Sequence, residues 1–189
     1  MHKDIAKTLL SEEQIQARIR ALAAEINAAY PDTGRPDTEP LLVGILSGSL
    51  LFLADLARAL DRHVNMDFIA VSSYGGGTES TGVVRLLKDL NHSIGGRDVI
   101  IVEDIIDSGL TIKYLLDNLE TRHPKSLAVC ALLDKREARR IEVPVRFVGF
   151  PVPNEFLVGY GLDYQERYRN LRYVGVLKPE AYGSAGPAE

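Results

Sequence analysis

Residues 108–111, Ser-Gly-Leu-Thr, form a short stretch whose residue types are suited to binding a phosphate group. Gly109 lets the backbone approach an anion closely, and the hydroxyls of Ser108 and Thr111 can donate hydrogen bonds or cap a helix. If a helix begins here, its first turn adds backbone N–H groups without partners and the positive end of the helix dipole. The stretch therefore predicts an anion-binding loop.

Three acidic residues lie just before this loop, where they would repel a bare phosphate. Glu103 and Asp104 are adjacent, and Asp107 directly precedes Ser108. Carboxylates fit at such a place if they face hydrogen-bond donors or a cation, and ribose hydroxyls and Mg²⁺ both meet that need. The alternative is that Asp107 and Ser108 only cap a helix while the other two acids are solvated, which an isolated Asp-Ser-Gly-x-Thr would favour.

The elements on either side of the loop favour the phosphate and sugar site. Residues 99–102 are apolar at every position, which predicts a strand covered on both faces, as in the centre of a parallel sheet. After the loop, Ile112, Leu115, Leu116 and Leu119 have helical spacing and predict a helix that packs on that sheet. The loop then lies at the carboxyl end of a strand, where open α/β sheets bind ligands.

The segment 102–111, Val-Glu-Asp-Ile-Ile-Asp-Ser-Gly-Leu-Thr, resembles the phosphoribosyl-pyrophosphate signature of the type I phosphoribosyltransferases. It is most similar to their 6-oxopurine branch, the hypoxanthine (-guanine) phosphoribosyltransferases. The resemblance implies an open, mainly parallel twisted α/β sheet flanked by helices, with a small hood built from the chain ends. It also implies purine salvage, in which phosphoribosyl pyrophosphate and hypoxanthine or guanine give IMP or GMP. Mg²⁺ would be the cofactor and a homodimer or homotetramer the assembly.

The same resemblance assigns the phosphoribosyl group to the acids and the loop after them. The residues implied are Glu103, Asp104, Asp107, Ser108, Gly109, Leu110 and Thr111. Asp107 would also be the catalytic residue that accepts the proton lost from N7 of the purine, because aspartate is ordinarily ionised at neutral pH. A role only as a helix cap stays open.

A second loop, Ser47-Gly48-Ser49, follows the apolar run 41–46 and precedes an apolar helix at about 50–60. Taken alone it could be a helix cap. The resemblance implies that Ser47, Gly48, Ser73, Tyr74 and Arg169 contact pyrophosphate, and that the Leu46–Ser47 peptide is cis. The glycine-rich segment 72–82 would then be a lid that excludes water, the alternative being a hairpin loop whose returning strand is 83–87.

The base-binding half is implied at Lys135, Phe156, Leu157 and Asp163. Lys135 would donate to O6 of the purine, Phe156 would stack on the ring, and the Leu157 backbone would bond to the base edge. For an isolated phenylalanine, ordinary core packing is the alternative. Asp163 would hold a second Mg²⁺ bound to pyrophosphate, while Glu103 and Asp104 serve the first metal or the ribose hydroxyls.

Composition limits the other classes of function. The 189 residues predict a single domain, with an amino-terminal helix at about 1–35, a core at about 41–150, a purine-binding hood segment at about 151–178 and a disordered tail at 183–189. The sequence lacks a membrane-length apolar run and a signal-peptide pattern, from which we expect a cytoplasmic protein. One cysteine and scattered histidines argue against a zinc site, and a net charge of −4 argues against a protein that coats nucleic acid.

One alternative from another class uses the basic cluster Lys135, Arg136, Arg139 and Arg140, which could make the fold a nucleotide sensor that binds RNA. Some family members carry lysine where this chain has Ser47 and Leu110, so their substrate affinity does not transfer. The sequence leaves open the preference among hypoxanthine, guanine and xanthine, and it leaves open the oligomeric state.

Overall fold

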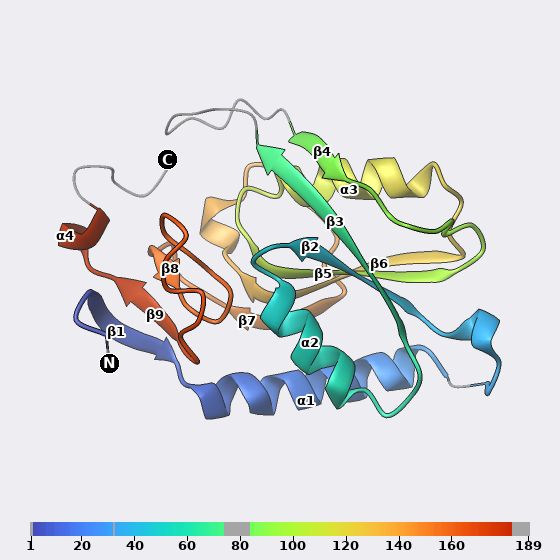
Figure 1. Ribbon diagram of the computed structural model, residues 1–189, viewed down its shortest axis with the longest axis horizontal. Coiled ribbons are helices and arrows are strands. Elements are labelled where there is room, and N and C mark those ends of the chain that lie inside the picture. The colour runs from blue at the N-terminus through green and yellow to red at the C-terminus, as the bar shows by residue number, and fades with distance from the viewer. Residues whose placement is uncertain (1, 32, 74–83, 183–189) are drawn as a thin grey trace.

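A computed structural model of the chain describes residues 2–31, 33–73 and 84–182 (Figure 1). Within these residues the main sheet has six strands in the order β4-β3-β2-β5-β6-β7. Neighbouring strands are parallel except for the pair β3 and β4. The strands are β2 (Leu41–Leu46), β3 (Asn65–Ser73), β4 (Val84–Lys88), β5 (Asp98–Ile106), β6 (Ser126–Asp134) and β7 (Phe147–Pro151). The expected open, mainly parallel α/β sheet is confirmed.

Strand β5 lies in the middle of the sheet between β2 and β6, and its residues 99–102 are all apolar. Val99, Ile100, Ile101 and Val102 are fully buried. Ile100 and Val102 pack in one apolar cluster with the helices α1 (Glu12–Ala29) and α2 (Leu50–Ala59), and the other two residues pack in a second cluster with α3 (Leu110–Glu120). Figure 1 shows α1 and α2 on one face of the sheet and α3 on the other. The predicted strand covered on both faces is confirmed.

The amino-terminal helix is shorter than the predicted range of about 1–35, since α1 covers Glu12–Ala29 and a strand occupies Ile5–Leu10. Ser11 and Gln14 form a capping box at the start of α1, in which each side chain accepts a hydrogen bond from the other residue's backbone N–H. The buried residues of α3 include Ile112, Leu115 and Leu119, the predicted apolar stripe. Two short 3₁₀ helices, η1 (Pro36–Thr38) and η2 (Arg136–Ala138), complete the connections.

The two ends of the described chain meet in a second, antiparallel sheet of order β1-β9-β8, which we call the hood. Its strands are β1 (Ile5–Leu10), β8 (Leu157–Val158) and β9 (Val174–Leu177), and α4 (Pro179–Tyr182) follows. Ile5 lies opposite Leu177, and Leu10 lies opposite Val174. The hood predicted from the chain ends is therefore confirmed, whereas strand β1 itself was not predicted from its sequence.

The two faces of strand β3 differ in burial, and the less buried face is the one that carries Met66. Met66 is 55% exposed, whereas Asp67 is 4% exposed. The Asp67 carboxylate accepts hydrogen bonds from the backbone N–H and side-chain amide of Asn91 at 2.7 and 2.8 Å, which explains how a charged group is tolerated inside.

In the described ranges, every helix is too short or too polar to cross a lipid bilayer. The predicted disordered tail and most of the predicted lid lie outside those ranges.

Candidate functional site

The connection from β5 to α3, residues 107–111, is a cradle of backbone donors that we call the phosphate loop. Gly109 has φ +84°, and a Cβ there would lie 2.4 Å from the Ile141 carbonyl oxygen, so both conformation and space require glycine. Helix α3 has no side-chain cap, and within the described residues the N–H groups of Thr111 and Ile112 have no acceptor. These N–H groups at the positive end of α3 are suited to an anion.

A small depression of about 80 Å³ lies over this loop. It is lined by Glu103, Ile105, Ile106, Asp107, Ser108, Gly109, Thr111 and Ile112. Most of the residues predicted to hold a phosphoribosyl group thus surround one hollow, because the whole set belongs to a single strand end and the turn after it.

Residues 139–141 support the back of the phosphate loop, and they belong to the segment that carries the predicted basic cluster. The backbone N–H groups of Arg140 and Ile141 donate to the Ser108 carbonyl oxygen at 3.0 and 3.1 Å. Just before them, the buried guanidinium of Arg139 pairs with the buried carboxylate of Asp134. Arg136 contacts the same carboxylate at 3.0 Å. Two cations of the supposed RNA-binding cluster are therefore paired within the chain, and the segment shapes the loop instead.

Glu103 and Asp104 lie on opposite faces of the sheet, since successive residues of a strand alternate. Glu103 lines the hollow over the phosphate loop, while Asp104 is 9% exposed and abuts Gly48. A Cβ at Gly48 would lie 1.9 Å from Oδ2 of Asp104. Burial, with the charge of Asp104, raises the pKa of Glu103 well above its usual range. Burial also raises the pKa of Asp104 to about 6, although the Ile105 N–H and the charge of Arg169 favour its ionised form.

The connection from β2 to α2, residues 47–49, is the predicted pyrophosphate loop, and its Leu46–Ser47 peptide is cis, as expected. Ser49 does not cap α2, because its hydroxyl donates instead to the Ile45 carbonyl oxygen at 2.7 Å. The hood packs directly on this loop, since a Cβ at Gly161 would lie 2.0 Å from the Gly48 carbonyl oxygen. The pyrophosphate loop therefore contacts both Asp104, near the carboxyl end of β5, and Gly161, next to the hood.

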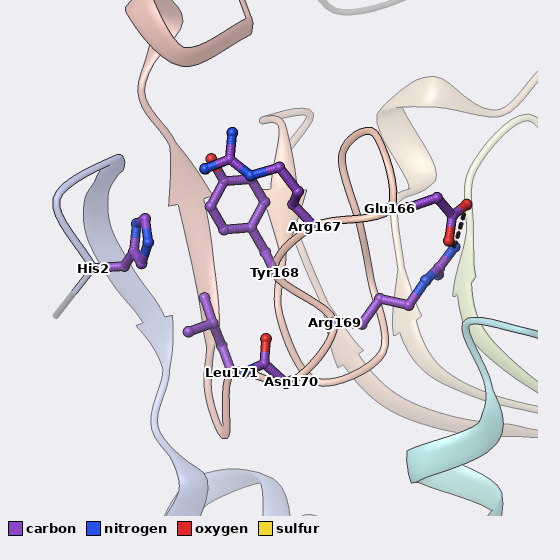
Figure 2. Close-up of a pocket in the computed structure, with 7 residues that line it drawn as sticks. All are labelled: His2, Glu166, Arg167, Tyr168, Arg169, Asn170 and Leu171. Carbon is purple, nitrogen blue, oxygen red and sulfur yellow. Dashed lines mark hydrogen bonds and ion pairs between the residues drawn. The ribbon is translucent and has the colours of Figure 1, made fainter.

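The hood loop, residues 159–173, carries two predicted ligands of pyrophosphate and metal. Arg169 pairs with Asp163 at 2.8 Å and donates from Nη1 to the Gly161 carbonyl oxygen at 2.9 Å. Figure 2 shows Arg169 extended toward Glu166, whereas Tyr168 lies on the side of the loop that faces His2. In this state the Arg169 guanidinium is held by acids of its own loop.

The two side chains predicted to contact the polar edge of a purine lie beside each other. Nζ of the buried Lys135 is 3.6 Å from Oδ2 of Asp107. They are 28 positions apart in sequence, but Ile106 and Asp134, the residues before them, are register partners in β5 and β6. The sheet register therefore places the predicted O6 donor next to the predicted proton acceptor.

Phe156 lies in an aromatic group of the hood. Its ring meets Tyr164 edge-on at 5.4 Å between centroids, and Tyr182 stacks on it at 5.0 Å with the planes 19° apart. A purine that stacks on Phe156 must use the opposite face of the ring or replace Tyr182. The neighbouring Leu157 is buried in β8 opposite Val176.

Two further predicted positions are less informative. Ser73 is the last residue of β3, and Tyr74 lies outside the described residues. Within the described part of the chain, no group of three or more acidic, histidine or cysteine side chains forms a metal site by itself.

Comparison with known proteins places this geometry among characterised enzymes. A family model described as a phosphoribosyl transferase domain matches residues 6–165. Hypoxanthine-guanine phosphoribosyltransferase of Bacillus subtilis is 51% identical over 184 residues, which cover 97% of this chain and 99% of that protein. A crystal structure of a hypoxanthine phosphoribosyltransferase from Staphylococcus aureus is similar with a TM-score of 0.90, at 46% identity, and covers 97% of both chains.

A third relative is longer than this chain. The bifunctional protein TilS/HprT of Listeria monocytogenes is 53% identical over 182 residues, which are 96% of this chain but 27% of that protein. The chain therefore spans about a quarter of the length of this relative.

Proposed function

The chain belongs to the phosphoribosyl transferase domain family, and from this premise we propose that it transfers a 5-phosphoribosyl group from phosphoribosyl pyrophosphate to hypoxanthine or guanine. The observation that carries the proposal is the phosphate loop, where N–H groups at the start of α3, without an acceptor among the described residues, line one hollow with the carboxylates of Glu103 and Asp107. Such a site accepts a phosphate and a hydroxyl-rich sugar together. The products are IMP or GMP and pyrophosphate.

The reaction exchanges one bond at C1 of the ribose for another. N9 of the base bonds to C1 while the bond from C1 to the pyrophosphate oxygen breaks, and the leaving group takes the electron pair. The proton on N7 passes to Asp107, whose carboxylate is 56% exposed and so accessible to a base. We assign the 5′-phosphate to the phosphate loop and the pyrophosphate to Ser47, Gly48 and Arg169.

Lys135 and Asp107 explain the choice of a 6-oxopurine. O6 and N7 are adjacent on the purine edge, so a cation and a carboxylate 3.6 Å apart can serve both atoms. The ammonium donates to O6, whereas the amino group of adenine offers a donor there and would leave Lys135 unpaired. Phe156 and Leu157 would hold the ring and the remaining edge.

The carboxylates fit Mg²⁺, because this ion is commonly held by one or two carboxylates together with substrate phosphates and water. Glu103 and Asp104 are enclosed at the end of β5, and Asp163 would hold a second ion once Arg169 turns to pyrophosphate. When bound, the metal neutralises charge on the leaving pyrophosphate. A homodimer or homotetramer remains our expectation for the assembly, to be checked by sedimentation.

The proposed function is tested by mixing the purified chain with phosphoribosyl pyrophosphate, Mg²⁺ and hypoxanthine and measuring both products. IMP and pyrophosphate are expected in equal amounts. Pyrophosphate release that does not depend on the base would show hydrolysis and overturn the proposal.

Gly109→Ala is expected to raise the KM for phosphoribosyl pyrophosphate by about 10- to 100-fold, because the added Cβ meets the Ile141 carbonyl oxygen and displaces donors of the phosphate loop. The matched control is Gly96→Ala, which has φ +72° and no atom within 4 Å of the added Cβ. Steady-state kinetics should separate the two variants. Equal KM values in both would contradict the assignment of this loop.

Lys135→Met is expected to lower kcat/KM for hypoxanthine by about 10- to 100-fold, because a buried hydrogen bond from a charged donor is lost. The kcat/KM for adenine should not change, so the ratio of kcat/KM for hypoxanthine to kcat/KM for adenine should fall. Lys113→Met, at an exposed pair with Asp117 on α3, is the control. Unchanged discrimination in Lys135→Met would refute the O6 role.

A further inference from the structure

One buried tyrosine of the hood loop is bonded to an aspartate of α2 that also accepts a hydrogen bond from α1. The Tyr160 hydroxyl donates to Oδ2 of Asp55 on α2 at 2.6 Å. The side-chain amide of Gln16 on α1 donates to the same oxygen at 2.6 Å. Tyr160 is 5% exposed. We call these three residues the hood anchor, and they lie outside the substrate contacts assigned above.

The backbone at the anchor has a conformation that a tyrosine rarely adopts. Tyr160 has φ +50° and lies between Gly159 at +98° and Gly161 at +103°. The left-handed region disfavours residues with a Cβ. The side chain at position 160 must therefore supply contacts that outweigh this preference, and the bond to Asp55 is the most specific of them.

The anchor is one residue away from the contact between the hood and the pyrophosphate loop. Gly161 abuts the Gly48 carbonyl oxygen, and its own N–H and carbonyl both bond to Arg169, at 2.9 Å each. Asp55 lies on the helix that begins directly after the pyrophosphate loop. A bond from Tyr160 to Asp55 therefore fixes Arg169 relative to Gly48 through two short, rigid segments.

We propose that the bond between Tyr160 and Asp55 positions the hood loop against the pyrophosphate loop, so that Arg169 and Asp163 can bind the pyrophosphate of the substrate. Tyr160 and Asp55 are then positioning residues, and this inference rests on the proposed function for its substrate. Burial and the Asp55 carboxylate also raise the pKa of the Tyr160 phenol, which keeps its proton available for donation.

The chain contains a matched control in the same loop. Tyr168 also has a left-handed backbone, with φ +77°, and is 7% exposed. Its hydroxyl donates to Oδ2 of Asp4 at 2.9 Å, but Asp4 precedes β1, so this bond stays within the hood. Tyr160→Phe and Tyr168→Phe each remove one hydroxyl that bonds to an aspartate, and only the first change removes a bond between the hood loop and α2.

In kinetics, Tyr160→Phe is expected to raise the KM for phosphoribosyl pyrophosphate about 10-fold, with kcat and the KM for hypoxanthine within about twofold of the parent. Tyr168→Phe should leave all three within about twofold. Asp55→Ala removes the acceptor of the Tyr160 hydroxyl and should raise the KM for phosphoribosyl pyrophosphate. Asp55→Asn keeps an oxygen that accepts from Tyr160, so it should avoid most of that rise. Equal KM values in the two tyrosine variants would overturn the link to pyrophosphate binding.

Hydrogen exchange tests the anchor without relying on activity. The N–H groups of Tyr160 and Gly161 donate to the carbonyl oxygens of Leu171 and Arg169 at 2.9 Å. Both amides should exchange at least about 10-fold faster in Tyr160→Phe than in Tyr168→Phe. Equal exchange rates of these amides in the two variants would overturn the hood anchor. Faster exchange in a chain that makes no nucleotide would support the anchor and refute only the proposed function.

Discussion

Asp107→Asn is expected to lower the single-turnover rate of nucleotide formation by about 10²- to 10⁴-fold, the usual contribution of a positioned general base. Asparagine keeps a polar side chain of nearly the same size but cannot take the proton from N7. Because the side chain is 56% exposed, the change should leave the stability of the fold nearly unaltered. Single-turnover mixing is the right measurement, since slow product release could hide the chemical step.

The control for Asp107→Asn is Asp117→Asn. Asp117 belongs to α3 and pairs with Lys113, as Asp107 pairs with Lys135, but its side chain is 62% exposed on the outer surface of the helix. This variant should react at the parent rate. A single-turnover rate in Asp107→Asn equal to that of Asp117→Asn would refute Asp107 as the proton acceptor.

Asp104→Asn is expected to stabilise the chain at neutral pH and to abolish most use of phosphoribosyl pyrophosphate. The folded chain holds the Asp104 proton up to about pH 6, whereas the unfolded chain loses it near 3.8. The folded state therefore binds more protons between these values, and its stability falls as the pH rises through that window. Above this pH window, the ionised Asp104 carboxylate lowers the free energy of unfolding by roughly 3 kcal/mol, and asparagine removes this loss.

Thermal unfolding at two pH values measures this effect. At pH 7.5 the melting temperature of Asp104→Asn should exceed that of the parent by several degrees, since about 1 kcal/mol shifts a chain of this size by 2–4 °C. Near pH 4 the folded parent carries a neutral Asp104, as the variant carries a neutral asparagine, so most of the difference should be gone. A variant less stable than the parent at pH 7.5 would contradict the burial argument. A variant with unchanged KM for phosphoribosyl pyrophosphate would contradict the assigned role of Asp104.

The phosphate loop could be predicted from the sequence because its determinants are local. A fully apolar strand, the acids, Gly109 and the stripe of α3 are consecutive, and each obeys a rule that needs no distant partner. The main sheet was predictable for the same reason, since β2, β5 and β6 are continuous apolar runs.

The hood could be expected only from family resemblance, because its elements depend on distant partners. Strand β1 has most of its middle exposed and two irregularities in its pairing with β9, so it lacks the alternation that marks a strand. Strand β8 is two residues long. Helix α4 is four residues long and begins at Pro179, and proline is well suited to the first turn of a helix.

The contacts that complete the site are likewise invisible in the sequence. The sequence placed Arg139 in a basic cluster, because nothing local shows that Asp134 is buried and pairs with it. The approach of Lys135 to Asp107 follows from the register of β5 and β6. Local residue types thus predict which chemistry a loop can do, and the sheet register decides which side chains meet.

The most direct test of the account is a competition among bases for one limiting substrate. The purified chain is incubated with limiting phosphoribosyl pyrophosphate, Mg²⁺ and equal amounts of hypoxanthine, guanine and adenine, and the nucleotides are separated by chromatography. We predict IMP and GMP, with pyrophosphate equal to their sum, and no AMP above the level in a sample with Mg²⁺ removed by chelation. AMP as a major product, or no nucleotide at all, would contradict the account.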